Sequence, residues 1–434
     1  MDVAEVKIWG NLVGAVAWNE ATGLAVFEYD PAFKSLGWDL APLQMPVRSE
    51  KTKFEFPALR KKPDPSWDTF KGLPGLLADV LPDKYGNELI NMWLAQQGRA
   101  PDSLNPVELL CFTGTRGMGA LEFEPATLKE QKRTFSIEME NLVEIAQKML
   151  YKKEAFTTNL QKDEEKAMME ILRIGTSAGG ARPKAVIAYN EKTGEVRSGQ
   201  TNAPKGFEHM LIKLDGVSDV QLGTTHGYGR VEMAYYNMAT ACGIEMMPSR
   251  LLEENGRAHF MTRRFDREGG DIKHHIQTFC ALKHFDYNAV TSFSYEQLFQ
   301  TMRELKLPYP TAEQMFRRMV FNVLARNCDD HTKNFSFRLR KDGLWELAPA
   351  YDICHAYQPG HQWVSRHALS INDKRSDITR EDLLTLGRSI KNKKAEDQVE
   401  EINNTVNHWK KFADEVKVSP GLRDEIAKTL INLK

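Results

Sequence analysis

The chain has 434 residues, of which 41% are hydrophobic and 27% are charged, as in an ordinary globular protein. This length predicts two or three domains. The formal net charge of −1 provides no global basic field, which argues against nucleic acid as an independent ligand but leaves a local basic patch open.

The five cysteines are scattered and include no CxxC pair. Together with the lack of a secretory leader, they predict reduced thiols in a cytoplasmic protein. No apolar run approaches the roughly eighteen residues that a membrane span needs, so we expect no membrane partner.

Residues 1–127 predict one α+β module. Residues 6–18 and 24–30 alternate between apolar and polar side chains as strands do, and Gly23 lies at the turn that makes them a hairpin. A helical region follows and is broken by Pro82.

Residues 119–125 predict a strand that returns to this module. The stretch GTRGMG at 114–119 leads into that strand and not into a helix. We therefore interpret it as a glycine-rich turn and not as a nucleotide-binding loop.

A loop of small residues at 174–183 leads into a predicted strand at 184–190. Gly175 and Gly180 have the GxxxxG spacing, but no Lys-Ser/Thr pair follows, so this is not a Walker A loop. The loop enters the strand through Lys184, which is closer to the strand–loop–strand by which kinases cover ATP. A flexible turn is the alternative.

The apolar strand predicted at 209–216 carries one cation, Lys213. Its side chain either reaches the surface or binds nucleotide phosphates as a kinase lysine does. On the helix that follows, Glu232 either pairs with Lys213 or is an ordinary exposed glutamate of a first turn, which we favour slightly.

Residues 249–267 predict a hairpin that turns at Asn255-Gly256. Its second strand runs into RRFD at 263–266, where a kinase hinge would meet adenine. From about 270 to 434 the pattern predicts helices, with 343–352 as the strand-like exception.

The segments DDHTKN at 329–334 and AYD at 350–352 carry the main chemical signal. Asp329 and Asn334 have the spacing of the catalytic aspartate and metal-binding asparagine of kinases, and Asp352 is a further carboxylate downstream. The alternative is a surface loop in which such residues bond to their own backbone.

The setting of DDHTKN favours a site. Thr311 and Gln314 predict a capping box, and apolar residues repeat with helical spacing over 316–324, which indicates a packed helix. A strand predicted at 335–339 follows. A rigid helix–loop–strand unit would therefore deliver the polar residues.

With these motifs the chain resembles the HipA family, the kinase toxins of bacterial type II toxin–antitoxin systems. VKIWGNLVGAVAW, FKGLPGLLADVLPDKYGN and LLCFTGTRGMGALEFEP carry the likeness in the first module. TSAGGARPK, LIKLDG, RRFDR, CDDHTKNFS and APAYDI follow in the family's order.

The resemblance implies an α+β chain with a two-lobed protein-kinase-like fold, an N-terminal α+β subdomain and a mostly helical C-terminal lobe. We expect the antitoxin-facing subdomain at 1–127, a region like a kinase N-lobe, with phosphate loop and hinge, at 128–269, and the C-lobe with the catalytic loop at 270–434.

The resemblance also implies a site for ATP and Mg²⁺. Asp329 matches the catalytic aspartate, and Asn334 and Asp352 match the Mg²⁺ ligands. The residues implied in ATP binding are Gly180, Lys184, Lys213, Arg263, Phe265, Asp266 and His331. Arg263 stands where some relatives carry Glu, but backbone groups read adenine there, so we expect little effect.

Ser177 matches the serine that the family autophosphorylates, and the neighbouring Thr176 offers a second acceptor hydroxyl. A phosphate on Ser177 adds about −1.5 to −2 charges to a loop that covers the phosphates of ATP. We expect this modification to reorder the loop and to switch the kinase off.

The motifs and the resemblance to the HipA family leave two functions of different class. The first is an ATP-dependent serine/threonine protein kinase that halts growth, is neutralised by a dimeric HipB-like helix-turn-helix antitoxin, and acts on a substrate such as an aminoacyl-tRNA synthetase. The second is a co-repressor held on operator DNA mainly through the antitoxin. The full set of Lys213, Asp329, Asn334 and Asp352 favours the enzyme. Transfer to a small molecule, or of another group, is a third possibility.

Overall fold

The computed structural model describes residues 2–64, 68–128, 136–151, 172, 175, 182–199, 202–217, 227–270 and 272–433. The chain divides into two compact units. Unit 1 comprises Met1–His226, Arg250–Gln277 and Leu339–Gly343, and unit 2 comprises Gly227–Ser249, Thr278–Arg338 and Leu344–Lys434. The three-part division expected from the sequence stays a prediction.

An antiparallel five-stranded sheet begins unit 1, with strand order β4-β3-β2-β1-β5. The strands are β1 (Val3–Ile8), β2 (Asn11–Asn19), β3 (Leu24–Tyr29), β4 (Lys53–Phe54) and β5 (Leu121–Glu124). The hairpin turn at Gly23 is confirmed, with φ of 64° at this glycine. The single strand predicted at 6–18 is wrong, because Trp9 and Gly10, with φ of 50° and 79°, turn the chain between β1 and β2.

Helices lie along the chain between β3 and β5: α1 (Pro31–Lys34), η1 (Pro57–Leu59), α2 (Gly75–Ala78), α3 (Lys84–Gln96) and α4 (Pro106–Thr113). The predicted break at Pro82 is confirmed, since α2 ends before it and Asp83 caps α3 by accepting a hydrogen bond from Gly86 N (2.7 Å). The glycine-rich stretch 114–119 connects α4 to β5, as its interpretation as a turn requires.

A second antiparallel sheet in unit 1 has the order β7-β6-β8-β10-β9. Its strands are β6 (Lys184–Tyr189), β7 (Val196–Ser198), β8 (Glu208–Lys213), β9 (Ser249–Glu254) and β10 (Arg257–Arg263). The predicted turn between β9 and β10 is confirmed, with φ of 45° at Asn255 and 77° at Gly256, both in the left-handed region as a type I′ turn requires.

One hydrophobic core joins this second sheet to α3 and to α5 (Met139–Tyr151). Leu89 of α3, Leu142 and Ala146 of α5, and Ile187 and Ile212 of the sheet are all buried in it. Burying several large apolar side chains contributes roughly 1.5–3 kcal/mol each, which fixes the sheet on these helices.

The helical pattern predicted from residue 270 is wrong for its first residues. The chain forms β11 (Arg267–Glu268), β12 (Ile272–Lys273) and β13 (His275–Thr278) there. His275 and Gln277 are buried while the residues that alternate with them are half-buried, which is the pattern of a strand. β14 (Ser336–Leu339), which was predicted, and β15 (Trp345–Leu347) follow later.

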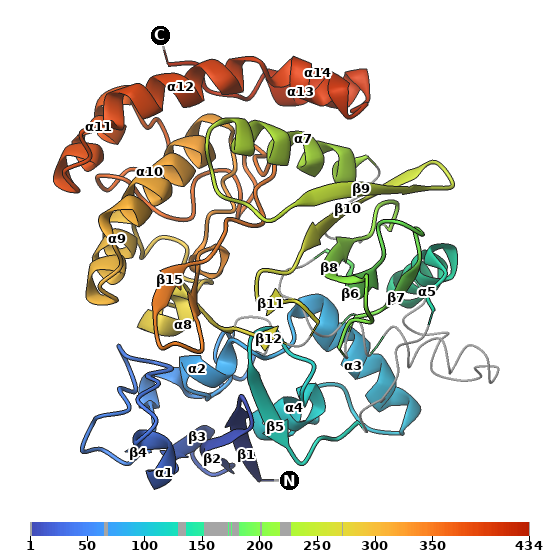
Figure 1. Ribbon diagram of the computed structural model, residues 1–434, viewed down its shortest axis with the longest axis vertical. Coiled ribbons are helices and arrows are strands. Elements are labelled where there is room, and N and C mark those ends of the chain that lie inside the picture. The colour runs from blue at the N-terminus through green and yellow to red at the C-terminus, as the bar shows by residue number, and fades with distance from the viewer. Residues whose placement is uncertain are drawn as a thin grey trace. The chain divides into compact units, whose positions relative to one another are not determined.

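Unit 2 is mainly helical. Its elements are α7 (Tyr228–Ala241), α8 (Phe279–Lys283), α9 (Tyr295–Glu304), α10 (Tyr309–Leu324), η4 (Thr332–Asn334), α11 (Arg380–Ser389), α12 (Ala395–Asn407), α13 (Trp409–Glu415) and α14 (Pro420–Ala427). Helix α12 packs against α10, and α13 packs against α7 (Figure 1).

Helix α10 carries the apolar face that its spacing predicted, and Phe316, Val320 and Leu324 on that face are fully buried. The predicted capping box is wrong. The helix begins at Tyr309, directly after Pro308, and the side-chain amide of Gln314 instead donates to Gly243 O (2.8 Å) and accepts from Glu245 N (3.1 Å).

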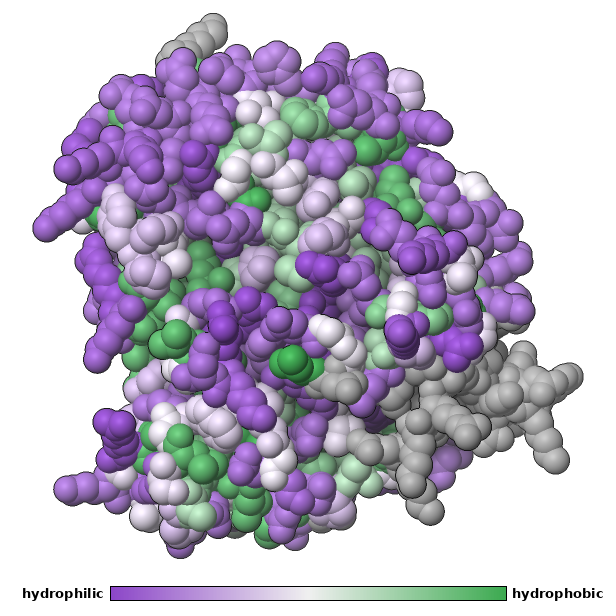
Figure 2. Space-filling model, viewed as in Figure 1, coloured by the Kyte–Doolittle hydropathy of each residue, from purple (hydrophilic) through white to green (hydrophobic). Residues whose placement is uncertain are grey.

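The visible face of the molecule is mostly hydrophilic, with hydrophobic residues in small separate patches (Figure 2). Within the part of the chain that the structure describes, no helix is both long enough and apolar enough to cross a membrane.

Candidate functional site

The loop that follows α10 places Asp329 and Asn334 together. The Asn334 side-chain nitrogen donates to the backbone oxygen of Asp329 (2.6 Å) and so closes the loop. Because the amide nitrogen makes this bond, the amide oxygen is the atom that Asn334 can offer to a cation. The side chain of Asp329 is 50% exposed, so its carboxylate is accessible to a substrate.

His331 lies in the same loop, directly before η4. Its Nδ1 accepts a hydrogen bond from Lys333 N (3.3 Å), and its ring packs on Tyr287 with 5.4 Å between ring centroids. Its Nε2 is 3.8 Å from Asp329 Oδ1. When protonated, His331 would therefore form an ion pair with Asp329.

The segment that carries Asp352 is fixed beside this loop. The Tyr351 hydroxyl donates to Lys333 O (2.7 Å) and lies 2.5 Å from Ser336 Oγ, so the residue before Asp352 bonds to both sides of Asn334. Asp352 has φ of 51°, in the left-handed region that aspartate and asparagine adopt more readily than other non-glycine residues.

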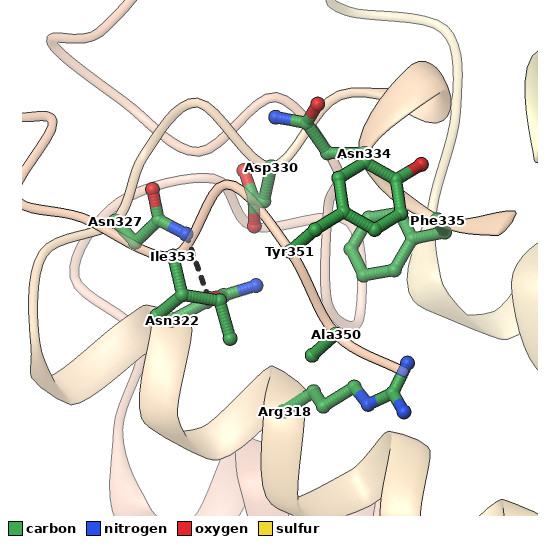
Figure 3. Close-up of a pocket in the computed structure, with 9 residues that line it drawn as sticks. All are labelled: Arg318, Asn322, Asn327, Asp330, Asn334, Phe335, Ala350, Tyr351 and Ile353. Carbon is green, nitrogen blue, oxygen red and sulfur yellow. Dashed lines mark hydrogen bonds between the residues drawn. The ribbon is translucent and has the colours of Figure 1, made fainter. Parts of the chain in front are cut away.

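A small cavity lies behind this loop (Figure 3). Its volume of about 10 Å³ is room for roughly one water molecule, so it is not the nucleotide site. Arg318 is buried beside it and donates from Nη1 to Ala348 O (2.9 Å), and burial lowers the pKa of Arg318 to about 10. The cavity is lined by Arg318, Asn322, Asn327, Asp330, Asn334, Phe335, Ala350, Tyr351 and Ile353.

Asp330 is fully buried, unlike the neighbouring Asp329. Its Oδ2 accepts from the Tyr295 hydroxyl (2.8 Å) and is 3.0 Å from His367 Nδ1, while its Oδ1 accepts from Ala368 N (2.7 Å). Burial disfavours the charged form of both groups, but the attraction between the two opposite charges and the hydrogen bonds outweigh this effect. The pKa of Asp330 is lowered, and that of His367 is raised to about 10.

We expect His367 to remain an imidazolium at pH 8.5. Because its folded-state pKa lies above the ordinary value of about 6.5, its stabilising contribution is complete below pH 6.5 and is lost as the pH rises through 10. ¹⁵N NMR at pH 8.5 should show a protonated histidine ring whose signal disappears in His367→Gln. The absence of that signal from the wild-type protein would contradict the ion pair.

Lys184 and Lys213 are direct partners on the neighbouring strands β6 and β8 of unit 1, but their surroundings differ. Lys184 is 3% exposed, and its Nζ is 2.9 Å from Asp83 Oδ2. Lys213 is half-buried, with its Nζ 5.9 Å from the centroid of the Phe260 ring. Of the two, Lys213 is the better placed to meet a ligand.

The predicted hinge residues also lie in unit 1. Arg263 is half-exposed and pairs with Glu208 (3.2 Å), and Phe265 is half-buried. Asp266, predicted to lie beside the ribose, is fully buried and is held by Arg264, Arg267 and Gly119 N at 2.6–2.9 Å. These hydrogen bonds give the carboxylate a structural role, and its contact with a ribose stays a prediction.

Glu232 is buried, so its interpretation as an exposed glutamate is wrong. Its pairing with Lys213 stays a prediction, since the two residues belong to different units. Thr176, Ser177 and Gly180 lie outside the described residues.

Unit 2 thus brings together Asp329, His331, Asn334 and the segment with Asp352. Sequence reasoning missed Asp330 and His367. The two adjacent aspartates at 329 and 330 were a sequence signal for Asp330. By contrast, nothing in the sequence links His367 to a loop 37 residues earlier.

The donor set suits a hard cation that is shared with a ligand. Among the described residues, no group of three or more His, Cys, Asp or Glu side chains could hold a metal ion by itself. Asn334 and Asp352 offer an amide oxygen and a carboxylate, and Mg²⁺ is commonly held by one or two such groups together with substrate phosphates.

Two family models match the sequence: the HipA N-terminal domain over residues 4–124 and the HipA-like C-terminal domain over residues 176–425. No curated protein matches it.

Among solved structures, the chain is similar to one from the complex of HipA, HipB and operator DNA of the Shewanella oneidensis MR-1 toxin–antitoxin system. Identity is 17%, the match covers 99% of this chain and 92% of that chain, and the TM-score is 0.63. This likeness confirms the predicted fold class, the α+β fold expected of a HipA-like chain.

The proinflammatory kinase CtkA of Helicobacter pylori matches with 14% identity over 58% of this chain and 90% of that one, with a TM-score of 0.37. We draw no conclusion from a likeness of that size.

Proposed function

The chain belongs to the HipA family, and from this premise we propose that it is an ATP-dependent serine/threonine protein kinase that acts as a HipA-like toxin. The observation that carries the proposal is the closed loop of unit 2, in which Asn334 bonds to the backbone of Asp329 and leaves the Asp329 carboxylate exposed.

Each residue has a role in phosphoryl transfer. Asp329 would orient the attacking hydroxyl and accept its proton, which requires the accessible carboxylate that it has. Asn334 and Asp352 would hold Mg²⁺, which neutralises charge on the phosphates as the phosphoryl group moves. His331 would help to position phosphates, and Lys213 would bind the α- and β-phosphates. The backbone around Arg263 and Phe265 would receive adenine.

Two lysine substitutions should separate nucleotide binding from stability. Lys213→Met should weaken Mg-ATP binding and leave the free energy of unfolding nearly unchanged. Lys184→Met removes a cation that lies 2.9 Å from the buried Asp83 carboxylate and should cost about 3–5 kcal/mol of that free energy. Calorimetric ATP titration and urea unfolding measure the two effects. Equal losses of ATP affinity in both variants would contradict the separate roles.

We further propose that the kinase modifies itself on Ser177, with Thr176 as the alternative acceptor, and that this switches it off. The proposed partners are a HipB-like antitoxin, operator DNA bound mainly through that antitoxin, and a protein substrate such as an aminoacyl-tRNA synthetase. The presence of HipB and operator DNA in the Shewanella complex supports the first two. A cytoplasmic location fits these partners.

Intact-mass and peptide mass spectrometry after incubation with Mg-ATP tests the proposal. We expect one added phosphate, on Ser177 or Thr176. A protein that starts unmodified and gains no mass, on itself or on an added protein acceptor, would contradict the kinase.

A co-repressor is the second candidate function, and the same HipA–HipB–DNA complex favours it. The two functions can coexist. Antitoxin binding and operator retention that persist in a protein without kinase activity would show the second function by itself.

A further inference from the structure

The catalytic loop rests on a buried polar network that the proposed chemistry does not use directly. It contains an anion, Asp330, which is 1% exposed, and a cation, His367, which is 2% exposed. Burying two charges costs several kcal/mol per ion unless their mutual attraction and further hydrogen bonds offset it. Such a pair therefore raises the question of what it holds in place.

The network reaches the loop at several points. Besides Asp330, it includes Asn327, whose side-chain nitrogen donates to Asn322 Oδ1 (2.9 Å). Asn322 is on α10 and donates from Nδ2 to the Tyr295 hydroxyl (3.0 Å), which in turn donates to Asp330. Figure 3 shows Asn322, Asn327 and Asp330 around the cavity that Asn334 also lines.

His367 is itself held from the other side. Its backbone nitrogen donates to Arg375 O (2.9 Å), and its Nε2 lies 3.8 Å from Cys328 Sγ, on the residue before Asp329. The imidazolium thus faces both neighbours of Asp329 in the chain, Cys328 and Asp330. Because Asp330 directly follows Asp329, fixing its carboxylate also fixes the Asp329 carbonyl that receives the Asn334 amide.

We propose that His367 and Asp330 are the positioning pair of the catalytic loop, holding Asp329 and Asn334 in the geometry that phosphoryl transfer requires. This inference rests on the proposed kinase function. His367 does not touch the reacting groups and acts through Asp330, in the way that the hydrogen-bond partners of metal ligands orient those ligands.

The test is steady-state kinetics of His367→Gln with Mg²⁺ and ATP varied independently. We expect kcat to fall about 10- to 100-fold, the range seen when the hydrogen-bond partners of metal ligands are removed, and the Mg²⁺ concentration for half-maximal activity to rise about 10-fold. The KM for ATP should change little, because Lys213 and the hinge segment are left as they are.

A second pair of variants separates positioning from folding. The double variant Asp330→Asn/His367→Gln replaces the ion pair with a neutral hydrogen-bonded pair and should recover most of the kcat lost in either single variant. Tyr295→Phe removes one hydrogen bond to Asp330 and keeps the ion pair, so it should give a smaller shift in the Mg²⁺ requirement than His367→Gln. This variant replaces His367→Gln in the test if the latter does not fold.

The matched control is Gln398→Ala. Gln398 is a buried residue of α12 in unit 2, and its Oε1 accepts a hydrogen bond (2.8 Å) from Nδ2 of Asn392, which lies on the connection between α11 and α12. It should lower the unfolding midpoint and leave the Mg²⁺ requirement unchanged. The proposal is overturned if the folded His367 and Tyr295 variants keep the wild-type kcat and Mg²⁺ requirement, or if their activity falls only with the folded fraction. If the wild-type protein does not turn over Mg-ATP, this result contradicts the kinase proposal itself. The positioning role, which rests on that proposal, is then contradicted as well.

Discussion

Asp329→Gln should greatly slow self-phosphorylation and leave the protein folded. Removing a group that orients and deprotonates the attacking hydroxyl lowers the rate by about 10²- to 10⁴-fold. Half of the Asp329 side chain is exposed, and its backbone oxygen, which bonds to Asn334, is retained in the variant. Incorporation of labelled phosphate from ATP measures the rate, and thermal unfolding measures the stability.

The control for this experiment is Asp397→Asn, an exposed aspartate in the first turn of α12 that should keep wild-type activity. The Asp329→Gln variant should also lose growth arrest in cells while it still binds the antitoxin. Growth arrest that survives Asp329→Gln would mean that the catalytic residue has been wrongly identified.

Asp266→Asn should produce a large loss of stability. Its carboxylate is fully buried and receives hydrogen bonds from Arg264 (2.7 and 2.9 Å), Arg267 (2.6 Å) and Gly119 N (2.7 Å). The neutral amide leaves two buried guanidinium groups without their counter-charge, which should cost about 3–5 kcal/mol of the free energy of unfolding. Urea unfolding at pH 7 measures it.

The pH dependence of the same experiment gives a second check. Burial opposes ionisation of Asp266, but the two arginines outweigh it and hold the pKa of the carboxyl well below its ordinary value. The stabilisation is therefore complete above about pH 4 and is lost as the pH falls toward the folded-state value. Asp424→Asn, on an exposed ion pair with Arg423, is the control and should leave the urea midpoint unchanged. A urea midpoint for Asp266→Asn that equals the wild-type midpoint would contradict the stabilising role of the hydrogen bonds to Asp266.

Local signals in the sequence predicted much of the fold. Asn255-Gly256 marks a hairpin because both residues tolerate positive φ, and the spacing of Phe316 to Leu324 marks a packed helix because it places apolar side chains on one face. The turn at Trp9 was missed because tryptophan rarely takes the conformation found there. Helix α4 was also missed, although Asn105, Pro106 and Glu108 spell the capping box that opens it.

Interactions between distant residues were out of reach. Asp266 looked like a ligand-binding residue by its motif, and only the fold shows that a backbone nitrogen at position 119 and two arginines occupy its oxygens. Gln314 has the right spacing for a cap, yet the structure gives it partners about 70 residues earlier in the chain. The spacing of Asp329 and Asn334 could be predicted because one short loop contains both.

The discontinuity of unit 1 has a consequence for synthesis on the ribosome. Trp38 Nε1 donates to Lys341 O (3.0 Å), a partner that lies 303 positions later in the chain. At about 5–20 residues per second, the ribosome delivers that partner roughly 15–60 seconds after Trp38. Unit 1 therefore cannot be completed until the codons for the catalytic loop have already been read. In the proposed toxin, a chain that terminates before this point lacks both a finished first unit and Asp352, so such a chain would not be an active kinase.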